Sequence, residues 1–95
     1  MKNIIALALS TVLFSGMSQA CDKPAAPALP DASTAVTAQM VKAKNDVQAY
    51  MAAAEAYLEC VADSAAHNEM VDNMKQVADG FNSAVRAYKT RMANA

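Results

Sequence analysis

The sequence predicts an all-α fold: an antiparallel, coiled-coil-like two-helix hairpin with an N-terminal polyproline-like strap pinned by a disulfide. Three observations predict it. The prolines are confined to residues 21–33, whereas residues 34–95 contain no proline and a single glycine. Apolar residues within 34–95 recur at alternating steps of four and three, the spacing of a helical seam. The two cysteines, Cys21 and Cys60, stand at the start of the strap and far along the first helix.

The first twenty residues have the pattern of a secretory signal peptide. Lys2 supplies the basic start, and residues 4–14 form the apolar run. Ser18 and Ala20 place small residues before the cleavage point. The run is too short for a membrane span, which needs about 20 apolar residues. We therefore expect residues 1–20 to be removed and the mature protein to be periplasmic or secreted.

The mature chain is weakly acidic. Removal of Lys2 with the signal peptide leaves seven basic residues against nine acidic ones, a net charge of −2. Such a chain has no electrostatic attraction for nucleic acid, so nucleic acid is not an expected partner.

Residues 21–33 form the expected strap. Its prolines recur at every third position, which matches the three-residue turn of polyproline II: Pro24, Pro27 and Pro30. Asp31 or Ser33 offers an N-cap for the first helix. Alanine, the best helix former, dominates the residues that follow.

Two apolar seams define a helical hairpin over residues 34–95, with helices at about 34–63 and 68–93. The first seam consists of Val36, Met40, Ala43, Val47, Tyr50, Ala54, Tyr57 and Val61. The second consists of Met70, Met74, Val77, Phe81, Ala84 and Tyr88. Folding the chain back pairs bulky residues with small ones, as interdigitating helices require. The expected layers are Val61/Met70, Tyr57/Met74, Ala54/Val77, Tyr50/Phe81, Val47/Ala84 and Ala43/Tyr88.

The turn is expected between Asp63 and Asn68, where Ser64 or Asn68 is placed to cap the second helix. This stretch contains neither glycine nor proline, so its sequence is also compatible with a helix that continues through it. Such a continuous helix, paired with a second chain, would bury the same layers between the two molecules. We favour the monomeric hairpin over this antiparallel homodimer.

The lengths of strap and helix predict a disulfide between Cys21 and Cys60. A polyproline II strap of this length spans about 37 Å, and the helix from Ser33 to Cys60 spans about 40 Å. A strap antiparallel to the helix therefore brings the two cysteines together. The bond would close a loop of about 40 residues and stabilise the fold by about 4 kcal/mol.

A second interpretation attaches a lipid to Cys21, because bacterial lipoproteins carry a cysteine directly after the cleavage point. Ser18 and Gln19 fit a lipoprotein signal poorly, and lipidation would leave Cys60 unpaired in an oxidising compartment. We favour the disulfide; only a lipid on Cys21 would tether the protein to a membrane.

No catalytic constellation is visible in the sequence. His67 is the single histidine and falls in the expected turn, without a recognisable nucleophile or orienting partner. We therefore expect the protein not to be an enzyme and to need no cofactor.

Two candidate sites lie near the turn. The first is a set of carboxylates at the tip of the hairpin, a surface for a protein partner: Glu55, Glu59, Asp63, Glu69 and Asp72. The second is a soft-metal site for Cu(I), formed by His67, Met70 and Met74 on one helical face. Met70 and Met74 are also required as seam residues, where Met is an ordinary core side chain, so the metal site is the weaker alternative.

The chain resembles a group of short exported helical proteins of Gram-negative bacteria. The resemblance is carried by the strap with Cys21, the motif Tyr57–Cys60 (YLEC), the pair His67-Asn68 and the run Val77–Lys89 (VADGFNSAVRAYK). The resemblance covers most of the mature chain. It implies export, helices and the disulfide, and it brings no catalytic residue to this chain.

The function expected from these observations is that of a non-enzymatic exported interaction or structural protein of the cell envelope. The Cu(I) binder and the lipoprotein acylated at Cys21 are the alternatives.

Overall fold

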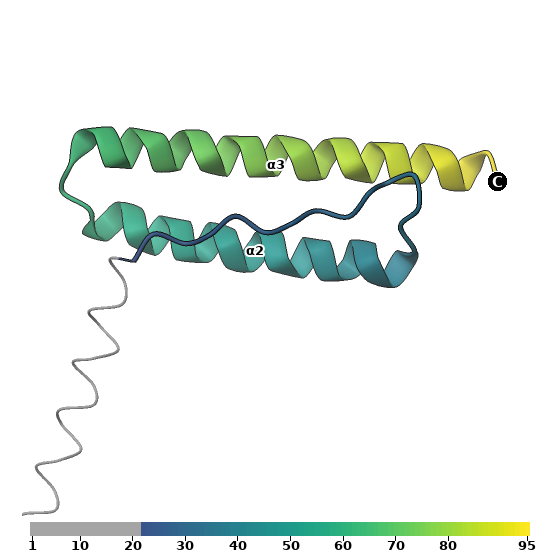
Figure 1. The fold of residues 1–95 in the computed structure, drawn as a ribbon, viewed down its shortest axis with the longest axis horizontal. Coiled ribbons are helices and arrows are strands. Elements are labelled where there is room, and N and C mark those ends of the chain that lie inside the picture. Colours follow the sequence, from purple (N-terminus) through teal and green to yellow (C-terminus); the bar gives the residue numbers. More distant parts are fainter. Residues whose placement is uncertain (1–21) are drawn as a thin grey trace, which may run out of the picture.

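The computed structural model describes residues 22–95, so the predicted signal peptide and Cys21 lie outside the described residues. The described chain forms two helices, α2 (Thr37–Cys60) and α3 (Ser64–Ala93). They run antiparallel and side by side along their length (Figure 1). The predicted all-helical hairpin is therefore confirmed for this part of the chain.

Helix α2 begins later than expected. Val36 is its N-cap residue, and the Val36 N–H donates to Gln39 Oε1 at 2.8 Å. The expected caps Asp31 and Ser33 were wrong, because Asp31 organises a turn before the helix. Its Oδ1 accepts from the Ser33 N–H at 2.9 Å and the Ser33 hydroxyl at 2.7 Å, while its carbonyl accepts from the Ala35 N–H at 2.9 Å.

The connection between the helices is shorter than expected and lies earlier in the chain. Helix α2 ends at Cys60 and α3 begins at Ser64, so the expected turn at 63–68 was wrong. The reason is Asp63, whose Oδ2 accepts from the Ala66 N–H at 2.8 Å. This N-cap satisfies a free donor of the first turn and starts the helix at once, without Ser64 or Asn68 as the cap.

The core follows the predicted seams along the middle of the hairpin. The buried residues of α2 are all seam positions: Met40, Ala43, Val47, Tyr50 and Ala54. On α3 the buried residues are Met70 and Val77, while Met74 and Phe81 are half-buried against the same cluster. Val36 departs from the prediction, since it is 59% exposed at the N-cap position. Met51 packs against the core although it lies outside the predicted seam.

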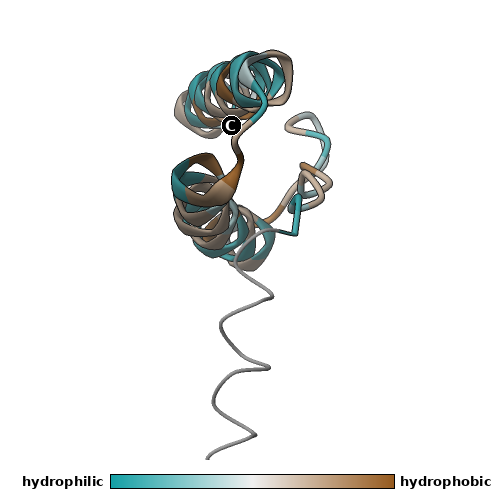
Figure 2. Ribbon diagram, turned by 90° about the vertical axis from the view of Figure 1, so that its left-hand side faces the viewer, coloured by the Kyte–Doolittle hydropathy of each residue, from teal (hydrophilic) through white to brown (hydrophobic). Residues whose placement is uncertain are grey.

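Residues 22–30, here called the N-terminal segment, run back along the hairpin without helix or strand. In Figure 1 the segment lies along α2 in the opposite direction, and the end-on view of Figure 2 places it on one side of the hairpin, beside both helices. Leu29 packs against the core cluster. The segment thus adds a third layer to a two-helix fold.

Candidate functional site

The five carboxylates proposed for the tip are all exposed, and two of them have structural partners. Asp63 caps α3, as described above. Glu69 Oε1 accepts from Lys23 Nζ at 3.1 Å, which ties the beginning of the N-terminal segment to the first turns of α3. Glu55, Glu59 and Asp72 lie on the surface of the two helices near the turn. The tip is therefore acidic and solvent-accessible.

The three residues proposed for Cu(I) are placed differently from one another. Met70 has an exposed fraction of 0% and belongs to the core cluster, whereas His67 and Met74 are half-buried. The Met70 thioether is thus enclosed by the side chains of the core cluster and is not open to solvent. Within residues 22–95, no group of three or more His, Cys, Asp or Glu side chains is placed to hold a metal ion. The geometry favours the structural role of Met70.

Cys60 is the last residue of α2 and is half-buried. The N-terminal segment begins at this same end of the hairpin, where Lys23 pairs with Glu69. The residue predicted to bond with Cys60 is Cys21, which lies outside the described residues.

The opposite end of the hairpin is joined by Arg91, a residue that no sequence motif singled out. Its Nε donates to the Ala32 carbonyl at 3.0 Å, and its Nη2 donates to the Ala35 carbonyl. The guanidinium also stands 5.4 Å from the ring centroid of Tyr88. Such charge-assisted bonds are stronger than neutral ones, so Arg91 fastens the turn before α2 to the end of α3.

Tyr88 completes this junction. Its hydroxyl lies 2.6 Å from Thr37 Oγ1 in the first turn of α2. The seam predicted Tyr88 to face α2, but nothing in the spacing indicated the hydrogen bond or the role of Arg91. These depend on side-chain reach across residues far apart in the chain.

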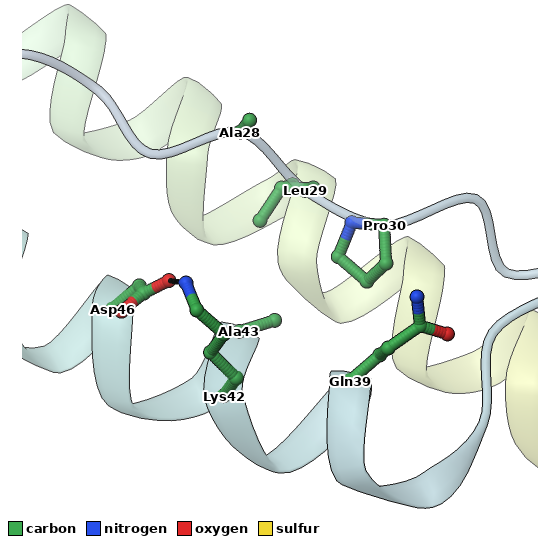
Figure 3. A pocket seen from close by; sticks show the side chains of 7 residues that line it. All are labelled: Ala28, Leu29, Pro30, Gln39, Lys42, Ala43 and Asp46. Carbon is green, nitrogen blue, oxygen red and sulfur yellow. Dashed lines mark hydrogen bonds and ion pairs between the residues drawn. The ribbon is translucent and has the colours of Figure 1, made fainter.

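An open groove lies between the N-terminal segment and α2, with a cavity volume of about 280 Å³ (Figure 3). Ala28, Leu29 and Pro30 line it from the segment. From α2 it is lined by Gln39, Lys42, Ala43 and Asp46, and Lys42 Nζ donates to Asp46 Oδ2 at 2.7 Å. Its charged groups thus pair with each other, and the groove offers no unpaired acid–base couple.

Two groups have perturbed acidity, and neither belongs to a catalytic set. The hydrogen bonds from the Ser33 side chain and backbone lower the pKa of Asp31, and the positive charge of Arg91 acts in the same direction. Burial raises the pKa of the Tyr50 phenol, against a smaller opposing effect of Lys23. The hydrogen bonds that lower the pKa of Asp31 also hold the turn before α2. The raised pKa of Tyr50 follows from its position in the core.

No protein-family model, curated protein or solved structure matches this chain. Among residues 22–95, neither helix is both long and apolar enough to cross a membrane.

Proposed function

We propose that this chain is a non-enzymatic, exported interaction or structural protein of the cell envelope, whose fold is pinned by a disulfide between Cys21 and Cys60. The observation that carries this proposal is the distribution of polar groups. The buried residues of the described chain are all apolar: Ala35, Met40, Ala43, Val47, Tyr50, Ala54, Met70 and Val77. Its charged groups consequently lie where another macromolecule can contact them.

The acidic tip is the surface that we assign to a partner. Glu55, Glu59 and Asp72 are exposed, and no lysine or arginine occurs between Lys44 and Lys75. Most basic residues lie toward the other end of the hairpin: Lys42, Lys44, Arg86, Lys89 and Arg91. The one cation that contacts the tip, Lys23, is paired with Glu69. A partner with a basic surface would find electrostatic complementarity at the tip, which speeds association and fixes orientation.

Three observations support the disulfide. The N-terminal segment reaches the end of α2 that carries Cys60. Lys23, two residues after Cys21, is held to Glu69 in the first turns of α3. No cysteine of the described residues is free. For a domain this small, a cross-link that closes a loop of about 40 residues supplies a large part of the stability.

Intact mass spectrometry of the exported protein tests export and the disulfide together. We expect a chain that begins at Cys21 and gains two hydrogens on reduction. An added diacylglycerol or a third acyl chain would instead establish a lipoprotein and remove the disulfide from the proposal.

Site-specific photo-crosslinking in cells tests the interaction role. A photoreactive residue at Glu59 or Asp72 should capture a discrete envelope protein, and the charge reversals Glu59→Lys and Asp72→Lys should weaken the capture of that protein by a probe at Glu55. Lys44→Glu, a charge reversal away from the tip, is the matched control. Equal capture by all the variants would overturn the role of the acidic tip.

A further inference from the structure

The core of the hairpin is covered on one side by the N-terminal segment. Leu29 of the segment packs against the core cluster and lies over Gly80 of α3. The end-on view of Figure 2 places the segment on a single side of the two helices. Within residues 22–95, no other segment lies on the opposite side, which is called here the open face.

Helical geometry identifies the residues of α2 on the open face. Gln39, Lys42 and Asp46 line the groove beneath the N-terminal segment. An α-helix has 3.6 residues per turn, so a residue two positions further along points to about the opposite side. Continued at steps of three and four, these positions form one stripe: Val41, Lys44, Gln48, Met51, Glu55 and Leu58. Such steps are the spacing with which one helix packs along another.

The stripe carries apolar side chains that the chain itself leaves in contact with water. Val41 is 52% exposed. Met51 and Leu58 pack against the core cluster and remain half-buried. On the side of the N-terminal segment, by contrast, Leu29 covers the same cluster. A further layer on the open face would therefore remove apolar surface from water on both sides of the core.

Helix α3 adds apolar side chains to the open face. Gly80 and Ala87 lie on the side of the N-terminal segment, because Leu29 lies over Gly80 and Ala87 lines a pocket together with Ala32. The positions two residues before them, and the position one heptad earlier, are apolar: Val71, Ala78 and Val85. Val71 is 43% exposed, and the other two are half-buried.

Two opposite charges of the α2 stripe have no ion-pair partner among the described residues. Lys44 and Glu55 are both exposed, and the ion pairs within residues 22–95 join other side chains. The two residues lie about three helical turns apart, too far to pair with each other. A second copy of α2 that runs antiparallel to the first can supply the opposite charge to both.

The stripe is complementary to itself in an antiparallel arrangement. One register of two antiparallel α2 helices pairs all six members at the same level: Val41 with Leu58, Lys44 with Glu55, and Gln48 with Met51. Apolar side chains then meet at both ends of the contact, and opposite charges meet between them. Because the relation is two-fold, each pair occurs twice and the contact closes as a dimer.

We infer that two copies of this chain form an antiparallel dimer through their open faces, with Lys44 of each copy beside Glu55 of the other. Each copy keeps its own hairpin, so this dimer differs from a pairing of two continuous helices. Polar residues at the packing positions fix the register of the two helices at a cost in stability. The inference goes beyond the proposed envelope role, because Glu59 and Asp72 of the acidic tip do not belong to the stripe.

Sedimentation equilibrium of the mature chain tests the dimer. Lys44→Glu and Glu55→Lys each place two like-charge pairs in the contact, and each should weaken dimerisation at least about tenfold. An equimolar mixture of these two variants should associate as a heterodimer, because both pairs are then again of opposite charge. Lys42→Glu makes the same charge change on the side of the N-terminal segment, and this matched control should dimerise like the wild type.

A second variant tests the apolar part of the contact. Met51→Glu should yield a monomer, and circular dichroism checks that every variant keeps the wild-type helix content. A wild-type chain that stays monomeric up to about 1 mM would overturn the inference. A mixture of the two charge variants that associates no better than either variant alone would overturn it as well, as would an equal loss of dimer in Lys42→Glu.

The dimer and the envelope role can fail separately. In the photo-crosslinking experiment, a product of twice the chain mass from a probe at Glu55 reports the second copy. Capture of another protein by probes at Glu59 and Asp72 reports the envelope partner. Lys44→Glu should remove the first product and keep the second, so the loss of either product identifies which of the two proposals is wrong.

Discussion

Leu29 of the N-terminal segment lies directly over Gly80 of α3, and these residues, 51 positions apart, determine how closely the segment approaches the hairpin. A methyl group at Gly80 would stand 3.3 Å from Leu29 Cδ1, tighter than an ordinary contact. The close approach that explains a glycine in mid-helix is thus made by the segment. This one contact sets the distance between the N-terminal segment and α3.

The pair can be tested with a double-mutant cycle. Gly80→Ala gains up to about 1 kcal/mol from helix propensity but must push Leu29 aside. In a Leu29→Ala background the obstruction is gone, so the same substitution should stabilise the chain more than it does in the wild type. Urea unfolding of the four chains measures the coupling. Identical effects of Gly80→Ala in both backgrounds would show that the two residues do not interact.

Among the basic residues, Arg91 should contribute most to the free energy of unfolding. Arg91→Met leaves the carbonyls of Ala32 and Ala35 without their charged donor, and we expect a loss of about 2–3 kcal/mol in the free energy of unfolding. Arg91→Lys should recover only part of this loss, because an ammonium lacks the planar fork that reaches both carbonyls. Lys89→Met, at an exposed position, is the control. An equal loss of stability in that variant would show that the bonds of Arg91 to the Ala32 and Ala35 carbonyls contribute nothing specific.

Loss of the N-cap of α3 should lower the free energy of unfolding by less than loss of Arg91 does. Asp63→Ala removes the acceptor for the Ala66 N–H and should cost about 1 kcal/mol of stability. Asp63→Asn keeps an acceptor oxygen and should cost a few tenths of a kcal/mol at most. Asp72→Ala, on the exposed surface of the same helix, is the control. Thermal unfolding followed by circular dichroism distinguishes these cases, and a loss confined to Asp72→Ala would refute the cap.

Substitutions of Met70 distinguish its role in the core from a role in binding Cu(I). Met70→Ala should lower the free energy of unfolding by about 2–5 kcal/mol, whereas Met70→Leu should cost less than about 1.5 kcal/mol. Met92→Ala, at an exposed position, serves as the control. In a competition assay with the Cu(I) chelator bathocuproine, we expect no transfer of copper to the wild-type protein. Transfer that disappears in a Met70→Leu, Met74→Leu chain would restore the copper site.

The Asp31 turn predicts a defined dependence on pH. Because the folded pKa of Asp31 lies below its ordinary value of 3.8, its contribution to stability is complete above the unfolded pKa and is lost as the pH falls through the lowered folded pKa. Ser33→Ala removes the largest cause, so it should move the pKa of Asp31 upward toward 3.8. An NMR titration of the Asp31 carboxyl carbon measures this, and an unchanged pKa in Ser33→Ala would contradict the assigned cause.

Much of the hairpin was predictable because helical periodicity is a local property. The spacing from Met40 to Ala54 on the first helix, and of Met70 and Val77 on the second, identified buried positions correctly. The helix ends were not predictable to the residue. Several polar residues near each end can serve as a cap, and the choice between Asp63, Ser64 and Asn68 depends on which side chain meets a free N–H.

For the candidate sites, too, one part was predictable from the sequence and another was not. The exposed carboxylates of the acidic tip could be predicted from the charge pattern alone, and the structure places them at the tip. The place of Met70 could not be settled by spacing, because one helical face serves equally as a core seam and as a ligand set. Only its packing against α2 shows that the side chain is fully buried.

The amino-acid sequence by itself determined the helical hairpin and the surface character of its charges, because apolar period and helix propensity act within a few residues. The tertiary structure decided what those local rules leave open: the contact of Leu29 with Gly80, the bonds of Arg91 to the turn before α2, and the burial of Met70. Each of these joins residues far apart in the chain, and its energy depends on distances that exist only once the segment and both helices have packed together.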